Sequence, residues 1–177
     1  MNFPDKKYKI IYADPPWSYN DKMSGHSFSL DHEYETQDIS WIKKLPVQDI
    51  ADKDCIFFLW AVSPMLPEAI ETIKTWGFKY TTLAFCWLKE TPLHQITVSN
   101  LGRWTMGGVE LCLLAKKGKP QRICKNIKQV VFEIRERHSK KPEQVRNDIV
   151  RLIGDIPRIE LFARQKTEGW DVWGNEV

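Results

Sequence analysis

The stretch Ile10-Ile11-Tyr12-Ala13-Asp14-Pro15-Pro16-Trp17 joins an apolar run directly to an acid, two prolines and a tryptophan. Near-continuous apolar runs are typical of strands that are buried on both faces of a parallel sheet. Asp14 would therefore stand just past the carboxyl end of a buried strand, at the edge where open α/β sheets bind their ligands. The stretch predicts both the first strand of the fold and the position of a site.

The two prolines leave mainly hydrogen-bond acceptors in this turn. Pro15 and Pro16 have no backbone N–H and fix φ, and Pro15 also favours an extended Asp14. The Asp14 carboxylate and nearby carbonyls would suit the NH₂ group of a planar ligand, on whose ring Trp17 and Tyr19 could stack. The alternative is that Asp14 only caps a turn, which is the commonest use of Asp after a strand. The residues alone leave both interpretations open.

Further apolar runs alternate with segments of helical periodicity. The predicted strands are residues 9–13, 55–60, 81–88, 109–115, 130–134 and 158–163. The predicted helices are residues 36–44, with Thr36 as N-cap, 64–76 and 142–153. This alternation predicts one α/β domain, residues 1–177, with a doubly wound sheet. No helix separates 109–115 from 130–134, so we expect those two strands to form an antiparallel pair.

Composition excludes several classes of protein. The chain has 177 residues, of which 42% are hydrophobic and 28% charged, as in soluble globular domains. It has no apolar run near the ~20 residues of a membrane span, and its first residues lack the apolar core of a signal peptide. Four widely spaced cysteines have no metal-ligand spacing, so we expect reduced thiols, no metal site and a cytoplasmic location.

Positive charge is concentrated in one part of the chain. Residues 116–128 contain six basic side chains and no acid, and a second basic stretch follows at 135–141. Such a run is usually a solvated face of the protein. It is also what a nucleic-acid backbone requires, and Lys119 and Arg122 would then contact phosphates.

Five segments together resemble one enzyme family. Asp14-Pro15-Pro16-Trp17 is similar to the D/N-P-P-Y/F/W motif of methyltransferases that act on amino groups of adenine or cytosine, and with Ala13 before it to the version of the MT-A70 family of N6-adenine methyltransferases. The other segments follow in the family's order: CIFFLW (55–60), GRW (102–104) with ELCL (110–113), HSKKP (138–142), and ELFAR (160–164) with GW (169–170) and WGNE (173–176). The resemblance covers nearly the whole chain.

The resemblance implies a Rossmann-like, S-adenosylmethionine-dependent methyltransferase fold in permuted order, with a mixed, mostly parallel sheet. The catalytic strand would come first and the cofactor strand last, which fits the absence of a G-x-G-x-x-G motif. The implied cofactor-binding residues are Asp14, Lys117, Phe162, Ala163, Arg164, Asn175 and Glu176. The alternatives are a surface position for Lys117 and core packing for Phe162. Larger relatives also carry cofactor contacts well upstream of the motif, where this chain has only thirteen residues and Asp5 is a weak substitute.

The implied reaction is methyl transfer from S-adenosylmethionine to the N6 amine of adenine in DNA, leaving S-adenosylhomocysteine. Asp14, Pro15, Pro16 and Trp17 would be catalytic, with Asp14 and the Pro15 carbonyl accepting the hydrogens of the amine. The implied substrate-binding residues are Trp17, Tyr19, Arg103, Glu110, Lys119 and Arg122, although Glu110 could equally be a surface strand residue. The compact length favours a bacterial or phage DNA enzyme, and a homodimer would add contacts. The alternatives are an RNA N6-adenosine methyltransferase and a non-catalytic nucleic-acid-binding paralogue.

Overall fold

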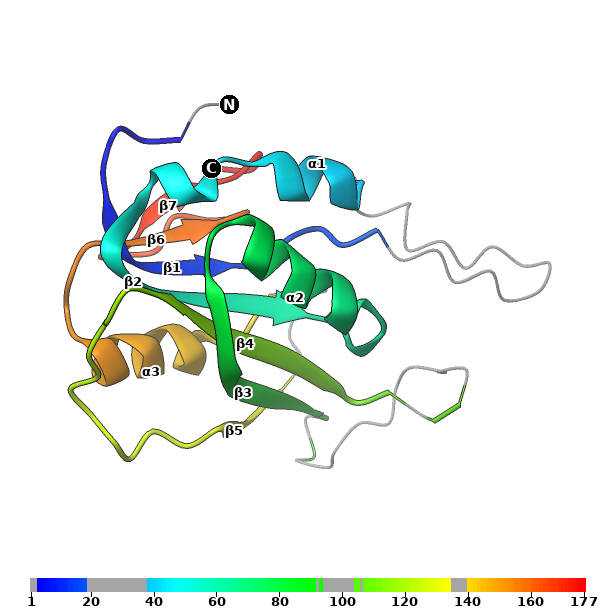
Figure 1. The fold of residues 1–177 in the computed structure, drawn as a ribbon. Coiled ribbons are helices and arrows are strands. Elements are labelled where there is room, and N and C mark those ends of the chain that lie inside the picture. The colour runs from blue at the N-terminus through cyan, green and yellow to red at the C-terminus, as the bar shows by residue number, and fades with distance from the viewer. Residues whose placement is uncertain (1–2, 19–37, 92, 94–103, 106, 135–139) are drawn as a thin grey trace.

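The computed structural model describes residues 3–18, 38–91, 93, 104–105, 107–134 and 140–177. These residues form one seven-stranded sheet with helices on both faces (Figure 1). In chain order the elements are β1 (Tyr8–Ala13), α1 (Ile39–Lys44), η2 (Val47–Asp49), β2 (Ala51–Ala61), η3 (Ser63–Met65), α2 (Leu66–Thr75), β3 (Lys79–Glu90), β4 (Val109–Lys117), β5 (Val130–Ile134), α3 (Glu143–Ile153), β6 (Arg158–Leu161) and β7 (Asp171–Trp173).

The strand order is β5-β3-β4-β2-β1-β6-β7, and β4 alone runs against the other six strands. This confirms the predicted mixed, mostly parallel α/β sheet. The predicted antiparallel pair of 109–115 with 130–134 is wrong, because β3 lies between β4 and β5 and pairs parallel with β5. The twelve residues between β4 and β5 are long enough for a crossover past one strand, so a missing helix did not imply a hairpin.

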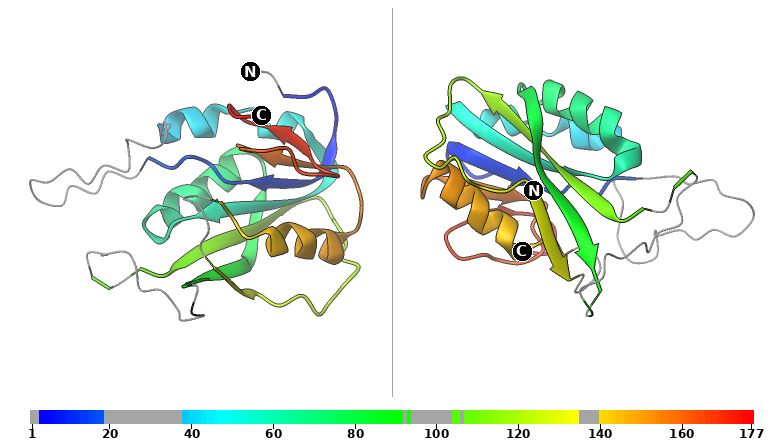
Figure 2. Two further views of the ribbon diagram at one scale, coloured as in Figure 1. Left: turned by 180° about the vertical axis from the view of Figure 1, so that it is seen from behind. Right: turned by 90° about the horizontal axis from the view of Figure 1, so that it is seen from below.

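Alternate residues of β1, an interior strand of the sheet, belong to two separate cores. Ile11 and Ala13 of β1 belong to the core under α1 and α2, whereas Ile10 and Tyr12 belong to the core under α3. Figure 2 shows α1 and α2 on one face of the sheet and α3 on the other. The near-continuous apolar sequence of β1 follows from burial on both faces.

The helices lie close to their predicted positions. Gly77 and Gly154 follow α2 and α3 with φ of 81° and 110°, a backbone region that favours glycine. The N-cap of α1 is Asp38, whose carboxylate accepts a hydrogen bond from the Ser40 N–H, so the predicted cap Thr36 is wrong and itself lies outside the described residues. Among the described residues, no helix has the length and apolar character needed to cross a bilayer.

Candidate active site

Asp14 stands where the sequence predicted it, directly after β1 at the carboxyl edge of the sheet. The preceding residue, Ala13, pairs with Leu59 of β2 on one side and with Leu161 of β6 on the other. The Asp14 side chain is only 20% exposed, and Lys141 Nζ donates a hydrogen bond to its Oδ2 at 2.6 Å. Burial raises the pKa of Asp14 above its ordinary value, although the charge of Lys141 acts in the opposite direction.

Asp14 begins a chain of alternating charges that crosses the sheet edge. Lys141 Nζ lies 3.3 Å from Glu110 Oε2, and Lys89 Nζ lies 2.5 Å from Glu110 Oε1. Burial alone would lower the pKa of Lys141, but Asp14 and Glu110 raise it overall. Burial alone would raise the pKa of Glu110, but Lys141 and Lys89 lower it overall. The two acids and the two lysines therefore form a paired network in a site that is largely shielded from water.

Trp17 is held in a fixed orientation beside this chain. Its indole Nε1 donates to the Trp60 carbonyl at the end of β2 at 2.9 Å, and its backbone N–H donates to the Pro15 carbonyl at 2.8 Å. Trp17 is half-buried and packs against the core under α1 and α2. The Pro15 carbonyl has two lone pairs, so one hydrogen bond to Trp17 leaves capacity for another donor.

Two separate sequence signatures meet beside Asp14. The Ala163 N–H, just after β6, donates to the Trp173 carbonyl at 3.0 Å. Gly174 follows β7, and a Cβ at this position would clash with the Ala163 backbone, so no other residue fits without a shift. This close approach brings the segment that begins with Phe162 against the segment that ends with Glu176.

The side chains of these segments contact one another. Phe162 has a φ of 61°, which is unusual for a residue with a side chain, and its ring meets Trp173 edge-on at a centroid distance of 5.5 Å. Arg164 Nε lies 3.7 Å from Glu176 Oε1, and the charge of Arg164 also acts on the pKa of Asp14. The predicted cofactor residues of both segments thus lie on the same edge of the sheet as Asp14.

A buried ion pair fixes α3 beneath this edge. Arg146 of α3 donates to both carboxylate oxygens of Glu160 in β6, at 2.7 and 2.6 Å. The Arg146 guanidinium also lies 5.5 Å from the centre of the Tyr12 ring. The pair positions the start of α3, and with it the neighbouring Lys141, against the end of β1.

The structure does not bring Lys117 to this site. Lys117 pairs with Cys55 at the start of β2, whereas Ala13 pairs with Leu59 near its end. Four strand residues, roughly 13 Å at about 3.3 Å per residue, therefore separate Lys117 from the last residue of β1. We expected Lys117 to contact the cofactor, but it lies at the opposite edge of the sheet, because β4 runs antiparallel to its neighbours.

Of the predicted substrate contacts, only Trp17 and Glu110 lie near Asp14 among the described residues. Lys119 is exposed at the opposite edge, where its backbone N–H donates to Asp54, and Arg122 is exposed in the segment that follows. Their predicted contacts with DNA phosphates stay predictions. Tyr19 and Arg103 fall outside the described residues.

Sequence reasoning missed the two lysines of the charge chain. Lys141 lies within the HSKKP segment, which was identified only as a helix start, and Lys89 lies near the end of a predicted strand. A basic residue at the carboxyl end of a buried strand was the available signal for Lys89. In the described residues, no group of three His, Cys, Asp or Glu side chains could hold a metal ion.

Comparison with known proteins shows to which family the chain belongs. The family model described as MT-A70 matches residues 8–176. The chain belongs to the MT-A70 family. Type II methyltransferase M.MunI of Mycoplasma sp is 36% identical to it, across 98% of this chain and 79% of that protein. The N(6)-adenosine-methyltransferase MT-A70-like protein of Arabidopsis thaliana is 27% identical across 96% of this chain but only 24% of its own length, and the mouse N(6)-adenine-specific methyltransferase METTL4 is 27% identical across 97% and 38%.

Proposed function

We propose that this MT-A70 chain is a DNA methyltransferase that transfers a methyl group from S-adenosylmethionine to the N6 amine of adenine. The observation that carries the proposal is the position of the Asp14 carboxylate and the Pro15 carbonyl, which are both hydrogen-bond acceptors. They lie at one sheet edge, beside the segment that begins with Phe162 and the segment that ends with Glu176. The similarity to a type II methyltransferase over nearly the whole chain supports DNA as the substrate.

Asp14 would act as an acceptor that orients the amine. The nitrogen lone pair of adenine is delocalised into the ring, so the free amine is a poor nucleophile. A carboxylate accepts several hydrogen bonds, and Asp14 can therefore take one amine hydrogen while Lys141 stays bound. The remaining lone pair of the Pro15 carbonyl would take the other. Orientation and electrostatic stabilisation then supply the rate enhancement, without a covalent intermediate.

The residues present fit the cofactor. S-adenosylmethionine would supply an electrophilic methyl group on a sulfonium. Arg164 offers a cation for its carboxylate, Asn175 and Glu176 offer polar groups for the ribose hydroxyls, and Gly174 leaves the backbone open to close approach. We also infer the permuted order of the family, in which β1 carries the catalytic acid and the last strands, β6 and β7, carry the cofactor site.

RNA is the second candidate substrate. Its support is the similarity to the plant N(6)-adenosine-methyltransferase-like protein, of which this chain covers about a quarter. The larger coverage of the type II methyltransferase favours DNA. A non-catalytic paralogue is disfavoured, because Asp14 and its prolines are present and Asp14 lies within the charge chain.

Transfer of a labelled methyl group to pools of DNA and of RNA tests the proposal directly. We expect N6-methyladenine in DNA after nucleoside analysis, no product from the Asp14→Asn variant, and full activity from the matched variant Asp155→Asn at an exposed position. Labelled product in RNA alone would replace DNA by RNA as the substrate. Absence of product in both pools, with cofactor binding intact, would refute methyl transfer to adenine.

A further inference from the structure

Each lysine of the charge chain lies over the ring of a buried tryptophan. Lys141 Nζ lies 5.6 Å from the centre of the Trp60 ring, and Lys89 Nζ lies 5.0 Å from the centre of the Trp87 ring. Both distances are within the ~6 Å at which an ammonium group is attracted to the face of an aromatic ring, and this attraction is stronger where water is excluded. Trp60 and Trp87 are both buried and contact each other edge-on, with 6.4 Å between their ring centroids. These two side chains form the tryptophan pair.

Hydrogen bonds fix the orientation of both rings. Trp60 Nε1 donates to the Tyr12 hydroxyl at 2.6 Å, and Trp87 Nε1 donates to the Glu133 carbonyl at 3.2 Å. The Trp60 carbonyl also accepts a hydrogen bond from Trp17 Nε1. A buried indole that turned away would break its bond and leave an unpaired N–H in the core, which is costly. The tryptophan pair therefore offers two ring faces whose directions are set by the fold.

A lysine side chain does not by itself fix the position of its charge. The ammonium group is a point charge on a flexible stem of four carbons. Lys141 lies two residues before α3 begins at Glu143, so no helix holds its backbone. Asp14 and Glu110 both attract its ammonium group. The face of the Trp60 ring adds a third contact, and together the three contacts define where Nζ lies.

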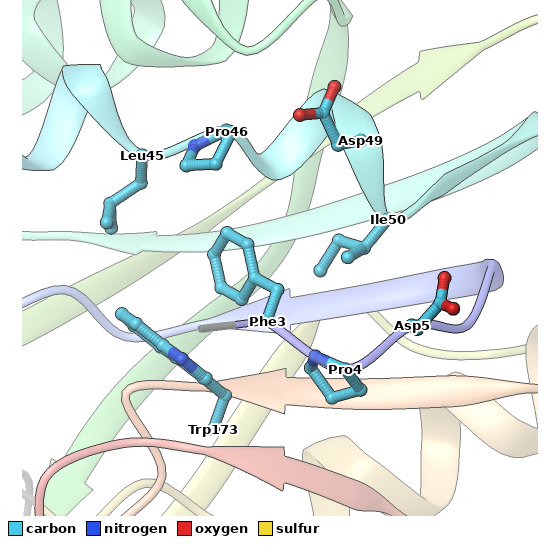
Figure 3. Close-up of a pocket in the computed structure, with 8 residues that line it drawn as sticks. All are labelled: Phe3, Pro4, Asp5, Leu45, Pro46, Asp49, Ile50 and Trp173. Carbon is cyan, nitrogen blue, oxygen red and sulfur yellow. The ribbon is translucent and has the colours of Figure 1, made fainter. Parts of the chain in front are cut away.

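The tryptophan pair lies on the face of the sheet that α3 covers, because both rings belong to the core there. A pocket of about 370 Å³ lies on the opposite face, beside the N-terminal segment, and its lining includes Phe3, Asp5 and Trp173 (Figure 3). Among the described residues that line this pocket, none belongs to the charge chain. The contacts that position the lysines are therefore separate from the pocket.

We propose that the tryptophan pair positions the charge chain, with Trp60 holding the Lys141 ammonium group against the Asp14 carboxylate. The second ring holds Lys89 against Glu110 in the same way. The inference deepens the proposed function and rests on it, since it explains how Asp14 is kept ready to accept the substrate amine. It gives a role to the segment CIFFLW (55–60), whose last residue acts through a lysine and not on the substrate itself.

Fluorinated tryptophans placed at position 60 test the proposal with little change in the shape of the side chain. Each added fluorine withdraws electrons from the ring face and weakens its attraction for a cation. The pKa of Asp14, measured by NMR from its carboxyl carbon, should rise with each fluorine, because the charge of Lys141 lowers this pKa and would be held less closely. Near neutral pH, kcat/KM should fall by about threefold or more. Other charged groups that act on Asp14 are unchanged in this series: Glu110, Arg146 and Arg164.

Two controls distinguish positioning of the lysine from a general disturbance of the core. Trp76 is as deeply buried as Trp60, but it belongs to the core under α1 and α2, where its Nε1 donates to the Ile42 carbonyl. Fluorination at position 76 should leave the pKa of Asp14 unchanged. In the Lys141→Ala variant, fluorination at position 60 should also leave this pKa unchanged, because the cation on which the ring acts is absent.

The NMR titration needs neither cofactor nor activity, so its result stands apart from the proposed function. If fluorination at position 60 does not change the pKa of Asp14, or changes it equally in the Lys141→Ala variant, the positioning role is wrong. Methyl transfer to DNA by the wild-type chain would then still support the proposed function. If the pKa rises as expected but the wild-type chain methylates neither DNA nor RNA, the tryptophan pair does position the charge chain and the proposed function fails.

Discussion

Both edges of this sheet carry lysines, but those at one edge are buried and paired, and most of those at the other edge are exposed to solvent. At the carboxyl edge, Lys141 and Lys89 are largely buried and paired with Asp14 and Glu110. At the amino edge, the basic run that begins with Lys116 is mostly exposed to solvent. Charges that a fold buries and pairs at a strand end are held in one geometry, whereas exposed charges contribute little and are screened by salt. Burial and pairing, more than the number of charges, therefore distinguish the edge that carries the candidate site.

The largest loss of activity is expected from changing Asp14, which is buried and paired at the carboxyl edge of the sheet. Asp14→Ala removes the main acceptor for the substrate amine, so methylation should fall by at least about a hundredfold while the thermal midpoint changes little. Single-turnover transfer from labelled cofactor measures the loss. A variant that keeps more than a few per cent of the wild-type rate would contradict the proposed role.

The next largest loss of activity is expected from Lys141, whose charge favours the ionised form of Asp14. The charge of Lys141 lowers the pKa of Asp14, so Lys141→Ala should raise that pKa further. Asp14 would then be protonated at higher pH, so the acidic limb of the pH profile of kcat/KM should move to higher pH. Near neutral pH, kcat/KM should fall by about tenfold or more.

Lys141→Arg is the matched rescue, because it restores the positive charge and should return the acidic limb toward its wild-type position. Lys117→Ala, at the opposite edge, should leave the profile unchanged. An unshifted profile for Lys141→Ala would show that the lysine does not control the protonation of Asp14.

A smaller and more specific effect is expected at the end of the chain. Removing residues 174–177 takes away Asn175 and Glu176 but keeps β7 and the bond from Ala163 to Trp173. Affinity for S-adenosylhomocysteine should fall by about tenfold or more, whereas stability should change little. Calorimetry on the truncated chain, with Val177→Ser as the control, measures this. Unchanged affinity would remove these two residues from the cofactor site.

The smallest effect should follow from reversing charge at the amino edge. Lys119 and Arg122 are exposed and lie away from Asp14, so Lys119→Glu/Arg122→Glu should change kcat/KM on DNA by less than about threefold at 0.15 M salt. The basic run is either a solvated face or a surface that binds DNA phosphates. Measuring the affinity of the wild-type chain and of this variant for DNA across a salt series distinguishes these two interpretations. A clear drop in the slope of log affinity against log salt would show that these side chains do contact phosphates.

Local patterns in the sequence were sufficient to predict several strands and helices, the position of Asp14 and the family. The apolar run before Asp14 predicted β1 and the site after it, and the helical stripes predicted α2 and α3, because periodicity reports burial directly. The five motifs indicated the MT-A70 family, which the match over residues 8–176 confirms. The three residues of β7 are too few to show a period, so that strand was not predicted.

Partners that are distant in the chain could not be predicted in the same way. The direction of β4 depends on which strands it pairs with. Because β4 is antiparallel to β2 and β3, Lys117 lies at the far edge of the sheet and not at the expected cofactor site. Lys141 reaches Asp14 across 127 positions of the chain, and only the packing of α3 under the sheet brings them together.

The sequence by itself determined the acid at the end of the first strand, the composition of the proposed cofactor segments and the family, since these are properties of short stretches of chain. Only the tertiary structure decided that Asp14 is paired with Lys141, that Lys117 and Lys119 lie at the other edge, and that Phe3 and Asp5 form a pocket with Trp173. The physical reason is that pairing and burial are set by strand order and direction, and these minimise the free energy of the whole sheet and not of any single segment.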